Sequence, residues 1–99
     1  MQEVLTSNTT MNNGSTIDLL SEEQGVAILK RFGDVIRRRR IELNLTQEQF
    51  SIRAGLHRTY VSNVERGERN LTLLTAMRIA QGLEISLLEL LTRALSEGT

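Results

Sequence analysis

Residues 46–66 read TQEQFSIRAGLHRTYVSNVER, and the organisation of the whole chain can be worked out from this segment. The TQEQ at its start is a capping box, in which a threonine and a glutamine satisfy each other's backbone N–H groups, so a helix is predicted over residues 47–54. Gly55 tolerates the positive φ that ends this helix in a tight turn. A further helix is predicted over residues 58–66. Two short helices joined by a tight turn are therefore the central unit of the chain.

The spacing of small and apolar residues tests whether these two helices pack on each other. Counted from Gln47, the fifth residue must be small because the helices cross closely there, and it is Ser51. The ninth residue must tolerate a positive φ, and it is Gly55. The fifteenth and eighteenth must be apolar, and they are Val61 and Val64. The complete set indicates a helix-turn-helix unit.

A long helix is predicted upstream of this unit. SEEQ at residues 21–24 is another capping box, and its acids suit the positive end of a helix. Apolar residues then recur at three- and four-residue spacing to about Leu43, and Asn44 can adopt the left-handed conformation that ends a helix. Because Gly25 weakens the first turn, Val26 is an alternative start.

Residues 1–20 are predicted to form a flexible arm in front of this helix. They are mostly polar, show no periodicity and offer little surface to bury. Ile17, Leu19 and Leu20 form a small apolar group that could dock on the body or on a partner. Residues 21–99 are predicted to form the domain itself.

Two more helices are predicted downstream. Thr72 caps a helix over residues 73–81 that Gly82 closes, and Ser86 caps a helix over residues 87–95. No stretch alternates with a period of two, so the predicted fold is all-α with five helices. The residues expected in the main core are Phe32, Ile36, Phe50, Val61, Val64 and Leu74.

Charge is unevenly distributed along the chain, although the formal net charge is zero. Residues 30–69 carry ten bases and five acids, whereas the segments on either side are acidic. Nine of these bases are arginines, whose planar guanidinium suits phosphate groups and guanine edges. The alternative interpretation is a solvated charged face, and composition alone leaves both open.

Composition excludes several kinds of site. The chain has 99 residues, enough for one domain, and no cysteine, so it has no disulfide, thiolate nucleophile or cysteine-based zinc site. A single histidine, His57, cannot form a histidine-rich metal site, and no metal or cofactor is expected. The chain shows no phosphate-binding glycine loop, and the adjacent acids Glu22 and Glu23 diverge on a helix, so an enzyme is not expected.

The sequence also predicts a location. No apolar stretch approaches the roughly 18 residues that cross a bilayer, and the N-terminus has no basic and apolar secretion signal. A cytoplasmic protein with no membrane partner is therefore expected.

Three segments carry a resemblance to a known family, namely RRRRIELNLTQEQF, AGLHRTYVSNVERGERNLTL and IAQGLEISLLELL. Their order and spacing, between Phe32 and Leu91, resemble the five-helix DNA-binding domain of the lambda repressor and Cro group, also called the Xre family. Within it, HRTYVS and ERGERNLTL look most like the small controller proteins of restriction–modification systems. Ser51 stands where the family usually has alanine, and its hydroxyl fits if it bonds back to its own helix.

The resemblance implies that the start of the helix over residues 58–66 enters the major groove of double-stranded DNA. Arg58 could then bond O6 and N7 of guanine, Thr59 could contact a thymine methyl or a base edge, and Asn63 could bind adenine. The base-reading residues implied are Arg58, Thr59, Ser62 and Asn63.

The same resemblance implies contacts to the DNA backbone. Gln47 resembles the family's phosphate clamp at a helix N-terminus. His57 is a weak cap that could also contact a phosphate, and Tyr60 could either reach a phosphate or pack partly on the preceding helix. The phosphate-contacting residues implied are Gln47, His57, Tyr60, Arg66, Arg69 and Asn70.

Arg40 and Glu65 match a pair that ties the first helix to the third in this family. We expect them to form a structural salt bridge, the alternative being that Arg40 joins a basic patch on the surface.

The last two predicted helices hold more leucine than a domain of about sixty residues can bury. The surplus predicts a homodimer interface, as in the family, whereas the alternative is an ordinary amphipathic helix with a few exposed leucines. The interface residues predicted are Ile85, Leu87, Leu90 and Leu91. Polar replacement of Leu90 or Leu91 is expected to leave the body folded.

Together these features predict a sequence-specific transcriptional regulator that binds a palindromic operator as a homodimer. RNA polymerase is a further partner that this function implies. The alternative is an antitoxin, which would use the same fold to bind its own promoter and would wrap a toxin protein with residues 1–20.

Overall fold

The structure is a computed structural model that describes residues 20–96. Five helices occupy that range, namely α1 (Glu22–Glu42), α2 (Gln47–Ala54), α3 (Arg58–Glu65), α4 (Leu73–Gly82) and α5 (Leu87–Ser96). No strand occurs among the described residues, and the predicted all-α, five-helix fold is confirmed. Most of the predicted arm, residues 1–19, lies outside the described range, and Leu20 at its end is exposed.

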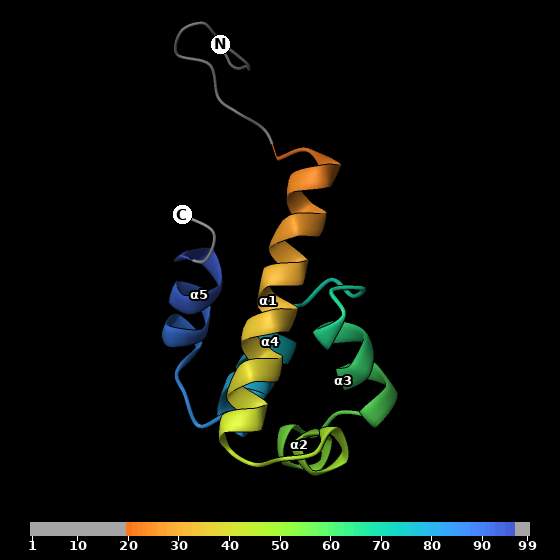
Figure 1. Cartoon of the computed structure of the whole chain (residues 1–99), viewed down its shortest axis with the longest axis vertical. Helices are drawn as coiled ribbons and strands as arrows, with labels where there is room; N and C mark the ends of the chain where they lie inside the picture. Colours follow the sequence, from red (N-terminus) through yellow and green to blue (C-terminus); the bar gives the residue numbers. More distant parts are fainter. Residues whose placement is uncertain (1–19, 97–99) are drawn as a thin grey trace, which may run out of the picture.

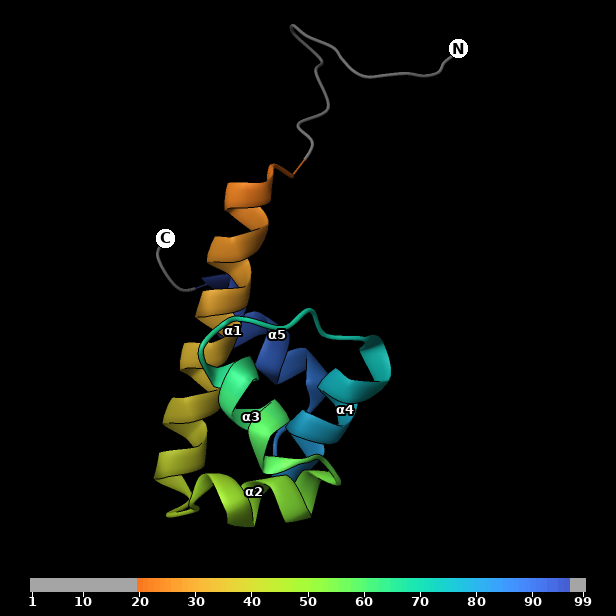
Figure 2. The same cartoon turned by 90° about the vertical axis from the view of Figure 1, so that its right-hand side faces the viewer.

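The long helix α1 is the axis on which the other helices are arranged (Figure 1). α3 packs on one side of it and α5 on the other, while α2 lies across its C-terminal end. α4 packs against α2 and α5. Figure 2 shows the first turns of α1 extending beyond the other helices. The α2–turn–α3 unit is therefore held at one end of the molecule by α1 and α4.

Each helix contributes to one apolar core. Its largest fully buried side chains are Phe50, Ile36, Ile79, Leu83, Leu90 and Val61. Five of the six residues expected in the core are buried. The sixth, Leu74, was predicted wrongly, because 69% of its surface is exposed. α4 turns Ala76, Ile79 and Ala80 inward, which directs Leu74 to the opposite face of the helix.

Leu90 also departs from its prediction. It was expected at a dimer interface, but it is 0% exposed and lies in the core of its own chain. α5 turns Leu90 and Ala94 inward, since residues four apart lie on one face of a helix. A side chain covered by its own chain contacts no second copy, so the predicted interface is reduced to Ile85, Leu87 and Leu91, which are half-buried.

The ends of α1 and α2 lie where the local sequence predicts them. Ser21 and Thr46 each form the predicted capping box, with both reciprocal hydrogen bonds present. Asn44 and Gly55 adopt left-handed backbone conformations, with φ of 58° and 69°. The chain therefore changes direction after α1 and after α2 at the residues expected to allow it.

The end of α4 differs from the prediction. Gly82 still belongs to the helix, and Glu84 is the left-handed residue, with φ of 59°. Gly82 instead allows close packing, because a Cβ there would lie 3.0 Å from Cε1 of Phe50. The side chain of Glu84 is paired with Arg53 on α2, and the hydrogen bond and charge of Arg53 lower the pKa of the Glu84 carboxyl.

Candidate nucleic-acid interface

The α2–turn–α3 unit has the packing that its spacing predicts. Val61 and Val64 lie on the inner face of α3 and are buried. Ser51 is buried where the two helices meet, and its hydroxyl donates a hydrogen bond to the carbonyl of Glu48 at 2.7 Å. The extra hydroxyl is thus satisfied within its own helix, and α2 and α3 can pack closely.

A buried ion pair fixes α3 to α1. Arg40 donates from Nε to Oε2 of Glu65 at 2.7 Å and from Nη2 to Oε1 at 3.0 Å. Its Nη1 donates to the carbonyl of Leu45 at 2.8 Å. The two side chains are 11% and 3% exposed. The structure therefore brings together the predicted pair, in the bidentate geometry that makes such pairs strong.

Gln47, at the first position of α2, joins the same network. Its Nε2 donates to Oε1 of Glu65 at 3.1 Å, so one carboxylate links α1, α2 and α3. The first N–H groups of a helix have no partner within it, and they form a natural site for a phosphate. The side chain of Gln47 thus lies at the positive end of α2, and its hydrogen bond to Glu65 fixes it there.

The outward face of α3 carries the four predicted base-reading residues. Arg58 and Thr59 are exposed at its start, and Ser62 and Asn63 are half-buried one turn later. These positions lie on one side of the helix, away from buried Val61 and Val64. His57 is the N-cap of α3 and is exposed, but its side chain makes no capping hydrogen bond.

Arg66 follows α3 directly and folds back over it. Its Nη1 donates to Oγ of Ser62 at 2.7 Å, and its Nη2 donates to Oδ1 of Asn63 at 2.5 Å. The same Nη2 lies 3.3 Å from Oε1 of Glu68. The structure thus joins one predicted phosphate contact to two predicted base readers.

Tyr60 and Arg69 form a second contact beside α3. The guanidinium of Arg69 lies 4.7 Å from the centroid of the Tyr60 ring, within the range of a cation–π interaction. Both residues line a cavity of about 390 Å³ between the starts of α3 and α4. The remaining lining residues are Gly55, Leu56, His57, Asn70, Thr72 and Thr75.

Two threonines in this cavity were missed as site candidates by sequence reasoning. Thr72 was predicted only as a helix cap, and it does accept a hydrogen bond from the N–H of Thr75 at 3.1 Å. Its hydroxyl also donates to the hydroxyl of Thr75 at 2.9 Å. A second hydroxyl three residues after a capping threonine was the available signal, because it must lie at the same exposed helix end.

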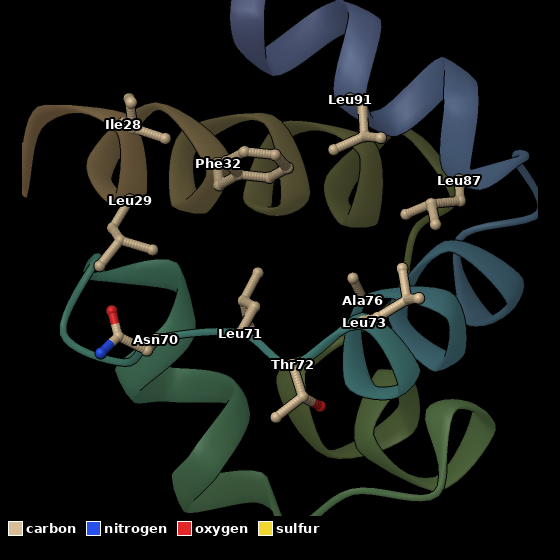
Figure 3. A pocket seen from close by; sticks show the side chains of 10 residues that line it. All are labelled: Ile28, Leu29, Phe32, Asn70, Leu71, Thr72, Leu73, Ala76, Leu87 and Leu91. Atoms are coloured by element: carbon tan, nitrogen blue, oxygen red, sulfur yellow. The ribbon is translucent and has the colours of Figure 1, made fainter. Parts of the chain in front are cut away.

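A separate apolar surface covers α4 and α5. A cavity of about 480 Å³ lies between α1, the segment before α4, and α5, and Figure 3 shows Leu73, Leu87 and Leu91 around it. A neighbouring cavity of about 350 Å³ is lined by Leu74, Met77, Ile85 and Leu87, among others. Part of both linings consists of large apolar side chains from α4, α5 and the segment between them. We call this part the α4–α5 face, formed by Leu73, Leu74, Met77, Ile85, Leu87 and Leu91.

Within residues 20–96, no group of three or more His, Asp or Glu side chains is arranged to hold a metal ion. None of the helices in that range is long and apolar enough to span a membrane.

Comparison with known proteins gives consistent matches. The model of the helix-turn-helix family matches residues 36–90. Control protein C.SmaI from Serratia marcescens is 54% identical over 50 residues, which are 50% of this chain and 60% of that relative. Control protein C.MunI from Mycoplasma sp is 43% identical over 61 residues, which are 61% of this chain and 82% of that relative.

Solved structures of restriction-modification controller proteins are also similar to this chain. The restriction-modification controller protein C.AhdI from Aeromonas hydrophila is 41% identical, with a TM-score of 0.63 over 65% of this chain and 97% of that one. The controller protein C.Esp1396I, solved as a tetramer with its natural 35-base-pair operator, is 37% identical, with a TM-score of 0.61 over 70% of this chain and 96% of that one.

Proposed function

The chain belongs to the helix-turn-helix family, and from that premise we propose that it is a sequence-specific transcriptional regulator of the restriction–modification controller type, acting as a homodimer on a palindromic operator. The observation that carries this proposal is the placement of α3. Its outward face presents Arg58, Thr59, Ser62 and Asn63, while its inner face is fixed by buried valines and by the Arg40–Glu65 pair.

The exposed residues at the start of α3 contact the base edges in this proposal. An α-helix fits the major groove, and its N-terminal residues reach the base edges in this class of domain. Arg58 is exposed and has the fork of donors that matches O6 and N7 of guanine. Thr59 beside it offers a methyl group and a hydroxyl to the adjacent base.

The residues around α3 contact the DNA backbone in this proposal. Gln47 stands at the N-terminus of α2, where helix N–H groups attract a phosphate. One cavity beside the start of α3 is lined by His57, Tyr60, Arg69 and Asn70. A DNA backbone that follows the edge of the groove would therefore contact these four residues together. Such contacts set the register of the protein on DNA without reading its sequence.

The homodimer would form through the α4–α5 face. Large apolar side chains are exposed there, including Leu73, Leu74 and Met77 on α4. A contiguous apolar surface of this kind marks an interaction site. A two-fold contact would set the two α3 helices about 34 Å apart, one turn of DNA, which matches a palindromic site. At a promoter in the cytoplasm, such a dimer would lie beside RNA polymerase.

Selection from random-sequence DNA tests this function. The full-length chain is incubated with a pool of random duplexes, and the retained duplexes are sequenced over several rounds. The proposal expects an inverted repeat whose half-sites are about 10 base pairs apart, centre to centre. Retention of every sequence equally, with binding that depends only on salt, would refute the proposal.

A further inference from the structure

Arg66 is placed so that it controls two base-reading side chains at once. It is the C-cap of α3, and its guanidinium reaches back one turn to Ser62 and Asn63. A guanidinium has donors only, so the atoms that face it must be acceptors. The hydroxyl oxygen of Ser62 and the amide oxygen of Asn63 are therefore turned toward Arg66.

This arrangement determines what the two side chains can offer to DNA. The oxygen of Ser62 accepts from Arg66, and its hydroxyl hydrogen remains available to donate to a base. The amide oxygen of Asn63 is directed toward Arg66, and although each of these oxygens has a second lone pair, the NH₂ of Asn63 is the group that Arg66 leaves unengaged. Reading adenine requires an asparagine to accept from N6 and donate to N7 together, whereas guanine presents acceptors only, at O6 and N7.

We infer that Arg66 is a specificity-determining residue that positions Ser62 and Asn63 as a pair of hydrogen-bond donors and directs this part of α3 to a guanine edge rather than to adenine. The inference rests on the proposed function, because it concerns the base that the regulator reads. It replaces the adenine contact that the sequence suggested for Asn63.

Glu68 supports a positioning role over a simple phosphate contact. Its carboxylate lies 3.3 Å from Nη2 of Arg66, where it would repel an approaching phosphate. Its backbone N–H donates to the carbonyl of Asn63 at 2.9 Å, so the loop that carries it is tied to the end of α3. Arg66 is thus held between an acidic partner and the two side chains that it orients.

The test measures binding of the full-length chain to the selected duplex by fluorescence anisotropy, over a series of salt concentrations and single base-pair changes. Asn63→Ala first identifies the base pair that Asn63 reads, since preference is lost at that position. We expect guanine there, and we expect Arg66→Ala and Arg66→Lys to reduce its discrimination by about tenfold. The lysine variant keeps the charge and loses the fork, so it separates positioning from electrostatics.

Further variants serve as controls. Arg66→Ala combined with Asn63→Ala should discriminate no worse than Asn63→Ala alone, because both changes remove the same contact. Arg69→Ala removes a neighbouring arginine that contacts Tyr60 and is proposed to contact the DNA backbone, so it should weaken binding on all sequences alike and leave the preference at this base pair unchanged. Circular dichroism melting verifies that each variant is folded. If Arg66→Ala does not fold, discrimination by Arg66→Lys tests the inference in its place.

Three outcomes would overturn the inference. One is adenine at the base pair identified by Asn63→Ala, or no base pair whose preference depends on Asn63. Another is unchanged discrimination at that base pair in Arg66→Ala and Arg66→Lys. The third is uniform weakening on all sequences by Arg66→Ala with a salt slope reduced by about one, which identifies a phosphate contact. Failure of the proposed function is distinct, since the unaltered chain would then show no sequence preference before any variant is compared.

Discussion

At the scale of single residues, the carboxylate of Glu65 joins three helices. It accepts two hydrogen bonds from Arg40 and one from Gln47, so it connects α1, α2 and α3 at one point. The pair was predictable from sequence, because both residues match a known motif. The orientation of Asn63 was not, since it depends on the side-chain conformation of Arg66, which sequence does not specify.

Glu65→Ala should lower the free energy of unfolding by about 3–5 kcal/mol, because it leaves the guanidinium of Arg40 buried without its partner. Urea denaturation measures this loss. Glu89→Ala is the matched control, since its pair with Arg93 lies at the surface and is worth at most about 1 kcal/mol. Equal losses in the two variants would contradict a structural role for the buried pair.

Arg58→Ala should weaken binding to the selected operator by about 1–3 kcal/mol and relax the preference at one base pair, because a bidentate contact to guanine is lost. Competition between the operator and single-base variants measures this change. Arg78→Ala, at an exposed position on α4, should leave the preference unchanged. An equal loss of affinity on all sequences would assign Arg58 to the phosphate backbone.

At the scale of elements, the crossing of α1 and α3 depends on Gly33. A Cβ at this position would lie 2.4 Å from the carbonyl oxygen of Glu65 and 2.7 Å from that of Val64. The capping box at Ser21 predicted the start of α1 and Asn44 predicted its end, but neither indicated this crossing. A glycine within a helical pattern carries no signal of its own, and its role depends on how closely α3 approaches.

Gly33→Ala should therefore destabilise the fold by roughly 1–3 kcal/mol, since the overpacking outweighs the better helix propensity of alanine. Gly25→Ala is an informative control on the same helix, because a Cβ there meets nothing within 4 Å. That variant should gain up to about 1 kcal/mol. Thermal melting of both proteins measures the effects, and shifts in the same direction would contradict the account of the crossing.

At the scale of the whole molecule, the fold separates two surfaces. The outward face of α3 is polar and basic, and the α4–α5 face is apolar. The leucine count correctly indicated that not all of these side chains are buried. It could not tell which are, because the leucines of α5 form one broad apolar face, and the sequence does not specify which part of that face packs against the core. The structure assigns Leu90 to the core and exposes Leu73 and Leu74.

Leu74→Glu should convert the dimer to monomers and weaken operator binding, while the chain stays folded, because Leu74 is exposed and contributes little to the core. Analytical ultracentrifugation measures the association. Ile52→Glu makes the same change at a comparably exposed position on α2, 74% accessible, and should leave the dimer intact.

Leu90→Ala completes this comparison. It should cost about 2–5 kcal/mol of folding stability through the cavity that it leaves in the core. A Leu74→Glu protein that remains dimeric would place the interface elsewhere, and a stable Leu90→Ala protein would contradict the position of α5.

Dimethyl sulfate protection of the selected operator tests most directly whether α3 reads the major groove. The reagent methylates N7 of guanine in the major groove and N3 of adenine in the minor groove, so it reports which groove is covered. If a dimer reads the major groove with its two α3 helices, guanine N7 is protected in two clusters about 34 Å apart on one face of the duplex, and part of this protection is lost with Arg58→Ala. Protection confined to adenine N3, or a single unpaired cluster, would contradict this placement of α3.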